Sequence, residues 1–169
     1  MVSHAIGQAA ADREADFDSL VGPLIDPAFK LAYVFLRDPH EAEDAVQEAT
    51  IKAWRNLDRL RDESAVRSWF LAIVANQCRS MRRSRWWSVL RMDSTPSTPY
   101  TSEHDDRIDL YREMARLPET DRAALFLFFY LDMPLAEVGR VLKISPQAAK
   151  SRVHRAVAKL RLEMVEVTE

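Results

Sequence analysis

Apolar residues recur at three- and four-residue steps along most of this chain, which is the spacing of one face of an α-helix. The clearest helix start is Asp38-Pro39, where a capping aspartate and a proline precede Glu41 in an Asp-x-x-Glu capping box. This helix is predicted to run to about residue 60, with a buried stripe of Ala42, Ala45, Val46, Ala49, Ala53, Trp54, Leu57 and Leu60. The opposite side carries Asp44, Gln47, Glu48, Ile51 and Arg55.

Helices are also predicted on both sides of this one. The first covers residues 27–37, and the second begins at a Ser64 cap. The apolar side of the second comprises Val66, Trp69, Phe70, Ile73, Val74, Cys78 and Met81. Its outer stripe places Asn76, Arg79 and Arg83 at i, i+3 and i+7, with Arg82 and Arg85 beside them. One helical face therefore presents an amide together with several guanidinium groups.

Residues 93–106 contain two prolines, six Ser or Thr and little to bury, which is typical of a flexible linker. Only three glycines occur in the chain, so an all-α fold is expected rather than a hairpin-rich one. The linker then separates two small helical domains, residues 17–92 and 107–169. Residues 1–16 are expected to be disordered.

The second domain has the spacing of a helix-turn-helix. Helices are predicted at 107–117 and 118–131, followed by a break at Asp132-Met133-Pro134, a short helix at 135–142 and, after a Ser145 cap, a longer helix at 146–165. The last helix turns groove-reading residue types outward: Gln147, Lys150, Ser151, His154 and Arg155. Arg152 and Lys159 are expected to meet phosphates.

Charge is segregated along the chain although the net charge is only -2. Residues 67–92 hold six arginines and no acid, whereas residues 1–66 hold 7 basic against 13 acidic residues. The basic segment also carries Trp69, Phe70, Trp86 and Trp87, and cations interleaved with flat rings suit unstacked nucleic acid. We expect weak DNA binding by the free protein, because acidic segments offset the attraction.

Several function classes are disfavoured. The one cysteine, Cys78, cannot form an internal disulfide, and no Cys/His spacing predicts zinc, so no metal or cofactor is expected. No paired carboxylates or nucleophile constellation suggests an enzyme. No leader and no run of membrane-spanning length is apparent, so a cytoplasmic protein without membrane insertion is expected.

Four motifs together make the sequence similar to bacterial RNA polymerase sigma factors of the extracytoplasmic-function (ECF) group in the sigma-70 family. They are Asp38-Pro-His-Glu-Ala-Glu-Asp-Ala-Val-Gln-Glu-Ala-Thr-Ile-Lys-Ala-Trp54, Val66-Arg-Ser-Trp-Phe-Leu-Ala-Ile-Val-Ala-Asn-Gln-Cys-Arg79, Leu117-Pro-Glu-Thr-Asp-Arg-Ala-Ala-Leu125 and Lys150-Ser-Arg-Val-His-Arg-Ala156. The resemblance covers nearly the whole chain. It implies sigma region 2 at 17–92 and sigma region 4 at 107–169.

The resemblance also implies partners and roles. Core RNA polymerase would contact Asp44, Gln47, Glu48, Ile51 and Arg55 through the clamp helices of its largest subunit. Single-stranded promoter DNA at the −10 element would meet Asn76, Arg79, Arg82 and Arg83, with the loop at 60–64 capturing a flipped base. Double-stranded DNA at the −35 element would meet Gln147, Lys150, Ser151, Arg152, His154, Arg155 and Lys159. An anti-sigma factor is implied as a regulator, and the turn residue Lys143 stands where such proteins often have glycine.

Other interpretations stay open at this stage. The acidic side of the helix after Asp38 also suits a solvated helix N-terminus, and Asn76 also suits a surface amide. Trp54 and Trp69 are expected in the core, and Cys78 is expected to be inert. Trp86-Trp87 fits a packed helix end, a stacking site or an inhibitor-binding patch. The alternatives for the whole protein are a stand-alone helix-turn-helix regulator and a sigma mimic that acts as an interaction decoy.

Overall fold

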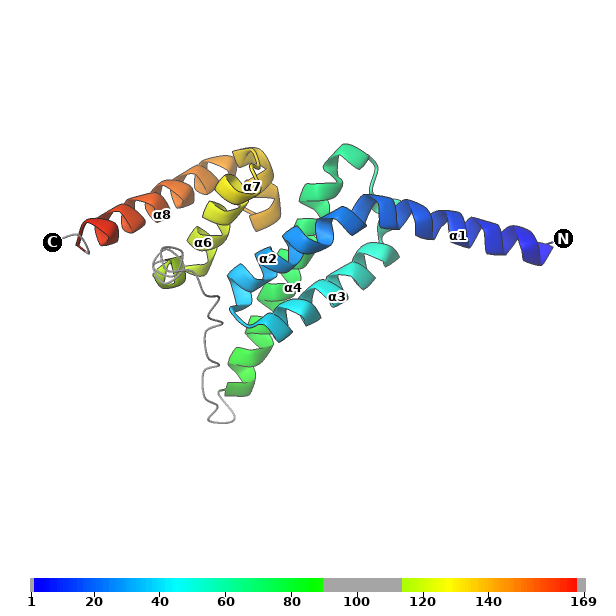
Figure 1. Ribbon diagram of the computed structural model, residues 1–169, viewed down its shortest axis with the longest axis horizontal. Coiled ribbons are helices and arrows are strands. Elements are labelled where there is room, and N and C mark those ends of the chain that lie inside the picture. Colours follow the sequence, from blue (N-terminus) through cyan, green and yellow to red (C-terminus); the bar gives the residue numbers. More distant parts are fainter. Residues whose placement is uncertain (1, 90–113, 167–169) are drawn as a thin grey trace.

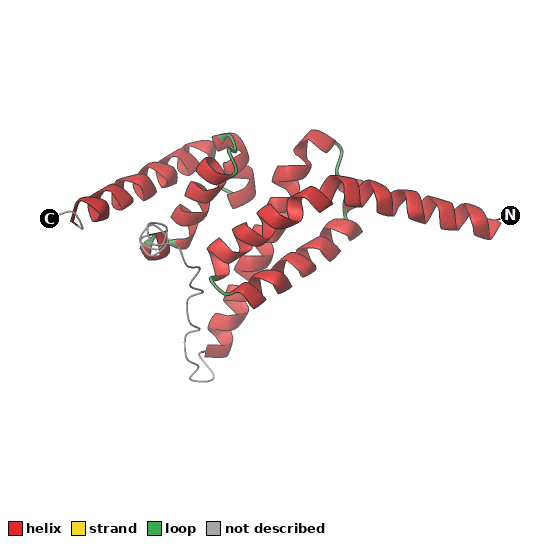
Figure 2. Ribbon diagram, viewed as in Figure 1, coloured by secondary structure: helices red, strands yellow, loops and turns green. Residues whose placement is uncertain are grey.

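The computed structural model describes residues 2–89 and 114–166, and within these ranges the regular structure is entirely helical (Figures 1 and 2). The first domain comprises α1 (Val2–Val21), η1 (Gly22–Leu24), α2 (Ile25–Leu36), α3 (Pro39–Arg55), η2 (Leu57–Arg59), η3 (Glu63–Ala65) and α4 (Val66–Val89). The second comprises α6 (Glu119–Leu125), η4 (Phe126–Tyr130), α7 (Leu135–Leu142) and α8 (Pro146–Glu166). The predicted all-α fold is confirmed. The predicted linker, residues 93–106, lies outside the described residues.

The start of α3 follows the local chemistry of its sequence. The Asp38 side chain accepts a hydrogen bond from the Glu41 backbone N–H at 2.9 Å, and Pro39 occupies the first turn. The helix ends earlier than predicted, at Arg55 instead of residue 60. There the Asn56 side chain donates to the Lys52 carbonyl at 2.8 Å, and the chain continues as the short 3₁₀ turn η2.

The prediction that Ser64 caps the next helix is wrong. Asp62 supplies the capping carboxylate, since its Oδ1 accepts from the Ser64 backbone N–H at 2.9 Å. Hydrogen bonding from the Ser64 side chain and, second, from its backbone N–H favours the charged carboxylate and lowers the pKa of Asp62. A 3₁₀ turn, η3, follows the cap, and α4 begins two residues after Ser64, at Val66.

The core of the first domain lies among α2, α3 and α4, which pack on one another (Figure 1). Its largest fully buried side chains include Leu31, Phe35, Phe70 and Leu71. Each such side chain contributes roughly 1.5–3 kcal/mol through burial. The small residues predicted on the inner stripe of α3 are buried, as are Val74 and Cys78 on α4, so the periodicity identified these two faces correctly.

The N-terminal segment is helical from Val2, where the sequence predicts disorder. Phe17 and Val21 are buried against the first domain, and the Phe17 ring meets the Trp54 ring edge-on at 5.2 Å between centroids. Arg13 lies over the same indole, 5.0 Å from its centroid. These contacts attach the C-terminal half of α1 to the domain, while its other half projects away (Figure 1).

One run, Asp12–Leu36, is long and apolar enough to cross a membrane by length and composition alone, contrary to the prediction from sequence. The run is not one regular helix, because η1 with Pro23 interrupts it. Ala28, Leu31, Ala32 and Phe35 within the run are buried in the core of the protein. Packing in the core therefore accounts for part of its apolar character.

The second domain packs α6, α7 and α8 around Leu127, Met133, Val138 and Val141. The predicted helix at 118–131 changes character after Leu125, where a single π-helical turn, η4, carries the run of aromatic residues. The predicted break follows, with Asp132 at φ 50°. The short helix occupies Leu135–Leu142, the range that the sequence predicts.

The two domains are in contact, which the sequence does not predict. Buried residues of both belong to one continuous apolar cluster that includes Phe35 and Val74 from the first domain and Leu127 and Val138 from the second. The packed elements are α4 against α7 and α2 against α6. The pairing follows from apolar surface that each domain leaves uncovered by its own helices.

Candidate nucleic-acid interface

The outer face of α3 is exposed within the described part of the structure. Asp44, Gln47, Glu48 and Arg55 are exposed, and Ile51 between them is 44% exposed. A large apolar side chain left in water within a ring of charged and polar groups is typical of a protein contact surface. The five residues predicted to contact polymerase therefore share one exposed helical face, which agrees with that prediction but does not test it.

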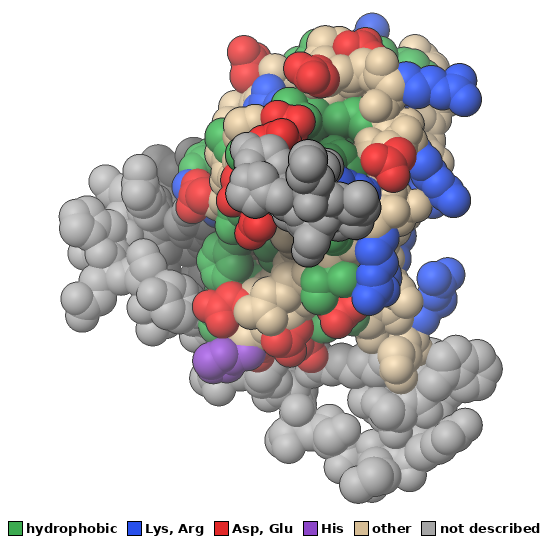
Figure 3. Space-filling model, turned by 90° about the vertical axis from the view of Figure 1, so that its right-hand side faces the viewer, with side chains coloured by type: hydrophobic (Ala, Val, Ile, Leu, Met, Phe, Trp, Pro, Cys, Tyr) green, Lys and Arg blue, Asp and Glu red, His purple; other side chains and the backbone are tan. Residues whose placement is uncertain are grey.

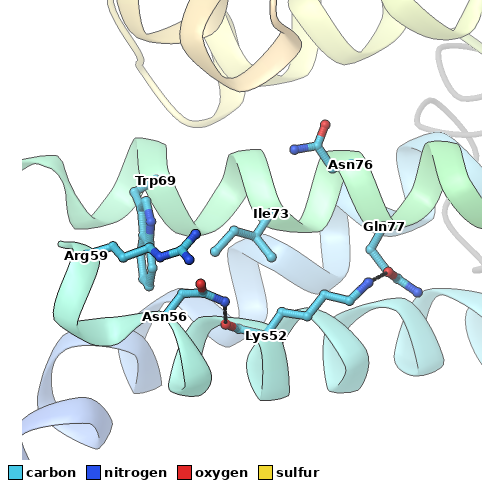
Figure 4. A pocket seen from close by; sticks show the side chains of 7 residues that line it. All are labelled: Lys52, Asn56, Arg59, Trp69, Ile73, Asn76 and Gln77. Atoms are coloured by element: carbon cyan, nitrogen blue, oxygen red, sulfur yellow. Dashed lines mark hydrogen bonds between the residues drawn. The ribbon is translucent and has the colours of Figure 1, made fainter.

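A pocket of about 330 Å³ lies between α3 and α4 (Figure 4). Its lining combines polar groups with apolar surface and one aromatic wall, and comprises Lys52, Asn56, Arg59, Trp69, Ile73, Asn76 and Gln77. The Lys52 ammonium donates to the Gln77 carbonyl oxygen, and this bond leaves the Gln77 amide N–H groups free to donate elsewhere. The pocket thus combines an indole, suited to stacking, with hydrogen-bonding groups that could read the edge of a base.

Most of this pocket is missed by reasoning from sequence. Only Asn76 was predicted to bind DNA, and Trp69, predicted to be core, is half-buried and lines the pocket. A signal existed on each helix separately, because Lys52 and Asn56 are one turn apart, as are Trp69 and Ile73. Nothing in the sequence says that these two faces meet.

Asn76 and Arg79 lie together on α4, as predicted. The Arg79 guanidinium donates to Asn76 Oδ1 at 3.1 Å and to the Leu142 carbonyl of the second domain at 3.0 Å. It also lies 5.7 Å from the centre of the Phe35 ring, and burial lowers the pKa of Arg79. Through Arg79, the predicted −10 surface is thus in contact with the second domain.

The remaining predicted −10 residues differ in their surroundings. Arg82 forms an ion pair with Glu119 of α6, while Arg83 is exposed. The side chains of Arg85, Trp86 and Trp87 lie outside the described part of the chain. Figure 3 shows another face of the molecule, where Lys and Arg side chains lie mainly along one edge and carboxylates are scattered among hydrophobic and uncharged groups.

The helix-turn-helix geometry is formed by three local features. Lys143 adopts φ 56°, so it takes the left-handed conformation that glycine adopts more easily. Gly139 approaches the turn closely, because a Cβ there would lie 2.7 Å from the Ile144 carbonyl oxygen. Ser145 caps α8, its Oγ accepting from the Ala148 N–H at 3.1 Å, which confirms the predicted cap.

The recognition face of α8 carries several exposed residues and two arginines that form ion pairs with α6. Gln147, Lys150, Ser151, His154 and Lys159 are exposed, while Ala149, Val153, Ala156 and Leu160 are buried, as the spacing predicts. The buried Asp121 carboxylate of α6 accepts from Arg152 at 3.1 Å and from Arg155 at 3.2 Å. The Asp121 carboxylate therefore holds both arginines in position. The Arg155 side chain is still 57% exposed.

Among the described residues, no group of three or more His, Cys, Asp or Glu is placed to hold a metal ion. Cys78 is buried, and burial raises the pKa of its thiol to about 12. A protonated, inaccessible thiol is a poor nucleophile and a poor ligand. The arrangement suits binding of nucleic acid and protein.

Comparison with known proteins agrees with this geometry. Residues 20–88 match the family model for Sigma-70 region 2, and residues 107–160 match that for Sigma-70, region 4. The chain is 31% identical to the ECF RNA polymerase sigma factor SigM of Mycobacterium tuberculosis over 153 residues, covering 89% of this chain and 78% of that protein. It is 30% identical to SigL of the same organism over 174 residues, covering 98% and 96%.

Solved structures show the same fold. The sigma factor RpoE from Bartonella quintana, in complex with the anti-sigma factor NepR, superposes with a TM-score of 0.76 at 23% identity, covering 91% of this chain and 99% of that one. CnrH, in complex with the cytosolic domain of CnrY, superposes with a TM-score of 0.67 at 24% identity, covering 95% and 94%.

Proposed function

This chain belongs to the ECF group of RNA polymerase sigma factors, and from that premise we propose that it recruits core RNA polymerase to promoters and opens the DNA there. Region 2 corresponds to the first domain and region 4 to the second. The proposal assigns no covalent chemistry to the protein, in keeping with a family whose members are not enzymes. Its site of action is the cytoplasm, where transcription takes place.

The observation that carries the proposal is the pocket between α3 and α4. It offers the Trp69 indole for stacking and the Gln77 amide for hydrogen bonds to an unpaired base of the −10 element. The Asn76 side chain points away from the other lining side chains in Figure 4, and its Oδ1 accepts from Arg79. Unpairing costs a few kcal/mol per base, and stacking on an aromatic side chain returns about 1–3 kcal/mol. Trapped bases therefore offset melting once polymerase holds the protein in place.

The other two surfaces position the protein on the polymerase and on the promoter DNA. The outer face of α3 docks on the clamp helices of the polymerase largest subunit, with Ile51 as the apolar contact among charged neighbours. The exposed side of α8 enters the major groove at the −35 element, where Lys150 donates to guanine and Gln147 pairs with adenine. Arg152 and Lys159 lie toward the phosphates.

An anti-sigma factor is the proposed regulator. The supporting observation is that the sigma factor RpoE of Bartonella quintana, whose fold this chain shares, is in complex with the anti-sigma factor NepR.

Transcription by holoenzyme reconstituted from purified core polymerase on a promoter library tests the proposal, with Gln77→Ala as the key variant. Arg79 stays intact because it also contacts the second domain. Capture of core polymerase should be unchanged, while the reactivity of unpaired −10 thymines to permanganate should fall about fivefold or more, as expected for loss of about 1–3 kcal/mol of base binding. Ser84→Ala, an exposed change on the same helix, is the matched control.

Loss of polymerase capture in the pocket variant, or full promoter opening, would refute the role of the pocket. A wild-type protein that binds promoter DNA but never captures polymerase would instead indicate a stand-alone helix-turn-helix regulator. Capture without transcription from any promoter would indicate a sigma mimic.

A further inference from the structure

Asp121, in the first turn of α6, binds two arginines of α8 with one carboxylate. Its Oδ1 accepts from Arg152 Nη1 at 3.1 Å and from Arg155 Nη2 at 3.2 Å, and its Oδ2 accepts from Arg155 Nε at 3.4 Å. Arg152 Nη1 also donates to Thr120 Oγ1 at 2.8 Å. The Asp121 side chain is only 4% exposed, so a buried group connects α6 to the predicted recognition helix.

The two arginines meet this carboxylate in different ways. Nη1 of Arg152 has two hydrogens and two acceptors, Thr120 and Asp121, and the Arg152 side chain is 28% exposed. Arg155 uses Nε and Nη2, which together form one edge of its guanidinium plane, and its side chain is 57% exposed. Arg152 therefore helps to fix Asp121, whereas Arg155 is fixed by Asp121 and still reaches solvent.

The opposite edge of Arg155 keeps a pair of donors. A guanidinium carries five N–H groups in one rigid plane. The bonds to Asp121 take the Nε–H and one Nη2–H, and among the described residues the other three N–H groups have no acceptor. One Nη1–H and the second Nη2–H lie side by side on the edge away from Asp121. We call this pair the free edge of Arg155.

From this geometry we infer that Asp121 is a positioning residue for DNA specificity, which presents the free edge of Arg155 to a guanine of the −35 element. The inference rests on the proposed function, in which α8 enters the major groove there. Guanine shows two neighbouring acceptors in that groove, O6 and N7, and two parallel arginine donors match them. Adenine places a donor beside its N7, cytosine presents a donor, and thymine offers one acceptor.

Fixing the guanidinium before DNA arrives favours this base over the phosphates. A free arginine side chain has many rotamers and can turn the same donors to the backbone, which carries no sequence information. A plane that is already oriented loses less freedom when it binds one base. The carboxylate also offsets a positive charge, so it weakens general attraction to phosphates. Loss of Asp121 should therefore lower discrimination between bases without lowering general DNA affinity.

The first test measures base preference of the full-length protein on a randomised duplex library, at low salt and without polymerase, by sequencing the bound fraction. The wild type should prefer guanine about fivefold or more at one position, the size of one bidentate base contact. Arg155→Lys should lose that preference there and at no other position. Asp121→Asn should lose it too, because one of its terminal atoms becomes a donor and the two-bond grip on Arg155 fails. Its affinity for sequences without this guanine should stay level or rise.

Glu137→Gln is the matched control. It makes the same change from carboxylate to amide in the same domain, but Glu137 pairs with Arg140 of its own helix, at 3.8 Å. The guanine preference should be unchanged in this variant. Two results for Asp121→Asn would overturn the inference: an equal loss of affinity for every base, which a merely structural role predicts, and an intact guanine preference.

The second test changes the DNA, so it holds even if Asp121→Asn folds poorly. 7-Deazaguanine replaces N7 by C–H and removes one of the two acceptors. At the preferred position it should weaken binding by the wild type about fivefold, the size of one hydrogen bond, and have little effect on Arg155→Lys. Circular dichroism verifies that each variant is folded. Wild-type binding that is indifferent to this change, or that shows no guanine preference, would overturn the inference.

These tests separate the inference from the proposed function. Neither uses polymerase, so failure to capture core polymerase would refute the proposed function while a guanine preference that depends on Asp121 still stood. Conversely, a holoenzyme that opens promoters, together with a free protein whose guanine preference is the same with and without Asp121, would refute the inference alone.

Discussion

Replacing Asp121 with alanine should destabilise the second domain more than any exposed charge change in it. The Asp121 side chain is 4% exposed and accepts from two arginines, Arg152 at 3.1 Å and Arg155 at 3.2 Å. Alanine removes these charge-assisted hydrogen bonds and leaves both guanidinium groups without their carboxylate. Arg152 suffers more, because its side chain is only 28% exposed.

The magnitude follows from these exposures. Breaking a buried ion pair from one side costs about 3–5 kcal/mol, since a buried charge is left uncompensated. Here the Arg155 side chain is 57% exposed and recovers much of its hydration, so its share is small. We therefore expect Asp121→Ala to lower the free energy of unfolding by about 2–4 kcal/mol, and Asp121→Asn by less, since the amide oxygen still accepts.

Urea unfolding followed by circular dichroism measures this loss, with Glu137→Ala as the control. Glu137 makes only a 3.8 Å pair with Arg140 on the same helix, and its loss should cost about 0–1 kcal/mol. A loss below about 1 kcal/mol for Asp121→Ala, equal to that of the control, would refute the reasoning that burial makes this carboxylate important.

Other predictions concern the turn, the thiol and the recognition helix. Gly139→Ala should destabilise the helix-turn-helix by about 1–3 kcal/mol, measured as thermal unfolding, because its Cβ would lie 2.7 Å from the Ile144 carbonyl oxygen; an unchanged midpoint would contradict this. Burial raises the pKa of Cys78 from about 9 to about 12, so unfolding releases a proton from this thiol in that pH range, and the contribution of Cys78 to stability should fall as pH rises from 9 to 12; the difference in unfolding free energy between the wild type and Cys78→Ala, measured across this range, should show this fall, and a difference independent of pH would contradict it. Lys150→Ala should cost about 1–3 kcal/mol at particular −35 base pairs in binding assays, whereas a uniform loss across sequences would make Lys150 a phosphate contact.

Local chemistry alone determined much of this fold. The Asp38 and Ser145 caps and the helix at 135–142 were predictable, because a capping side chain bonds a backbone N–H within three residues of itself. The buried faces of α3 and α8 were predictable from periodicity. The resemblance to ECF sigma factors also rested on contiguous motifs and is confirmed by the family models.

Errors in the sequence prediction arose where a short stretch of sequence is compatible with more than one local structure. Ser64 and Asp62 both suit a helix cap, and the structure uses the carboxylate of Asp62 to start a 3₁₀ turn. The predicted helix at 118–131 likewise gave no sign of the π-helical turn at Phe126–Tyr130, because a run of aromatic residues is compatible with both windings.

Only the tertiary structure decided what the arginines and the pocket face. The sequence shows that α4 is basic, but the acceptors of Arg67 and Arg79 are backbone carbonyls of Leu131 and Leu142, more than sixty residues away. Every residue carries such a carbonyl, so no side-chain pattern marks the two that are used. The pocket likewise forms because α3 and α4 pack in one register, and a helix pattern specifies which face is buried but not which residues of another helix lie against it.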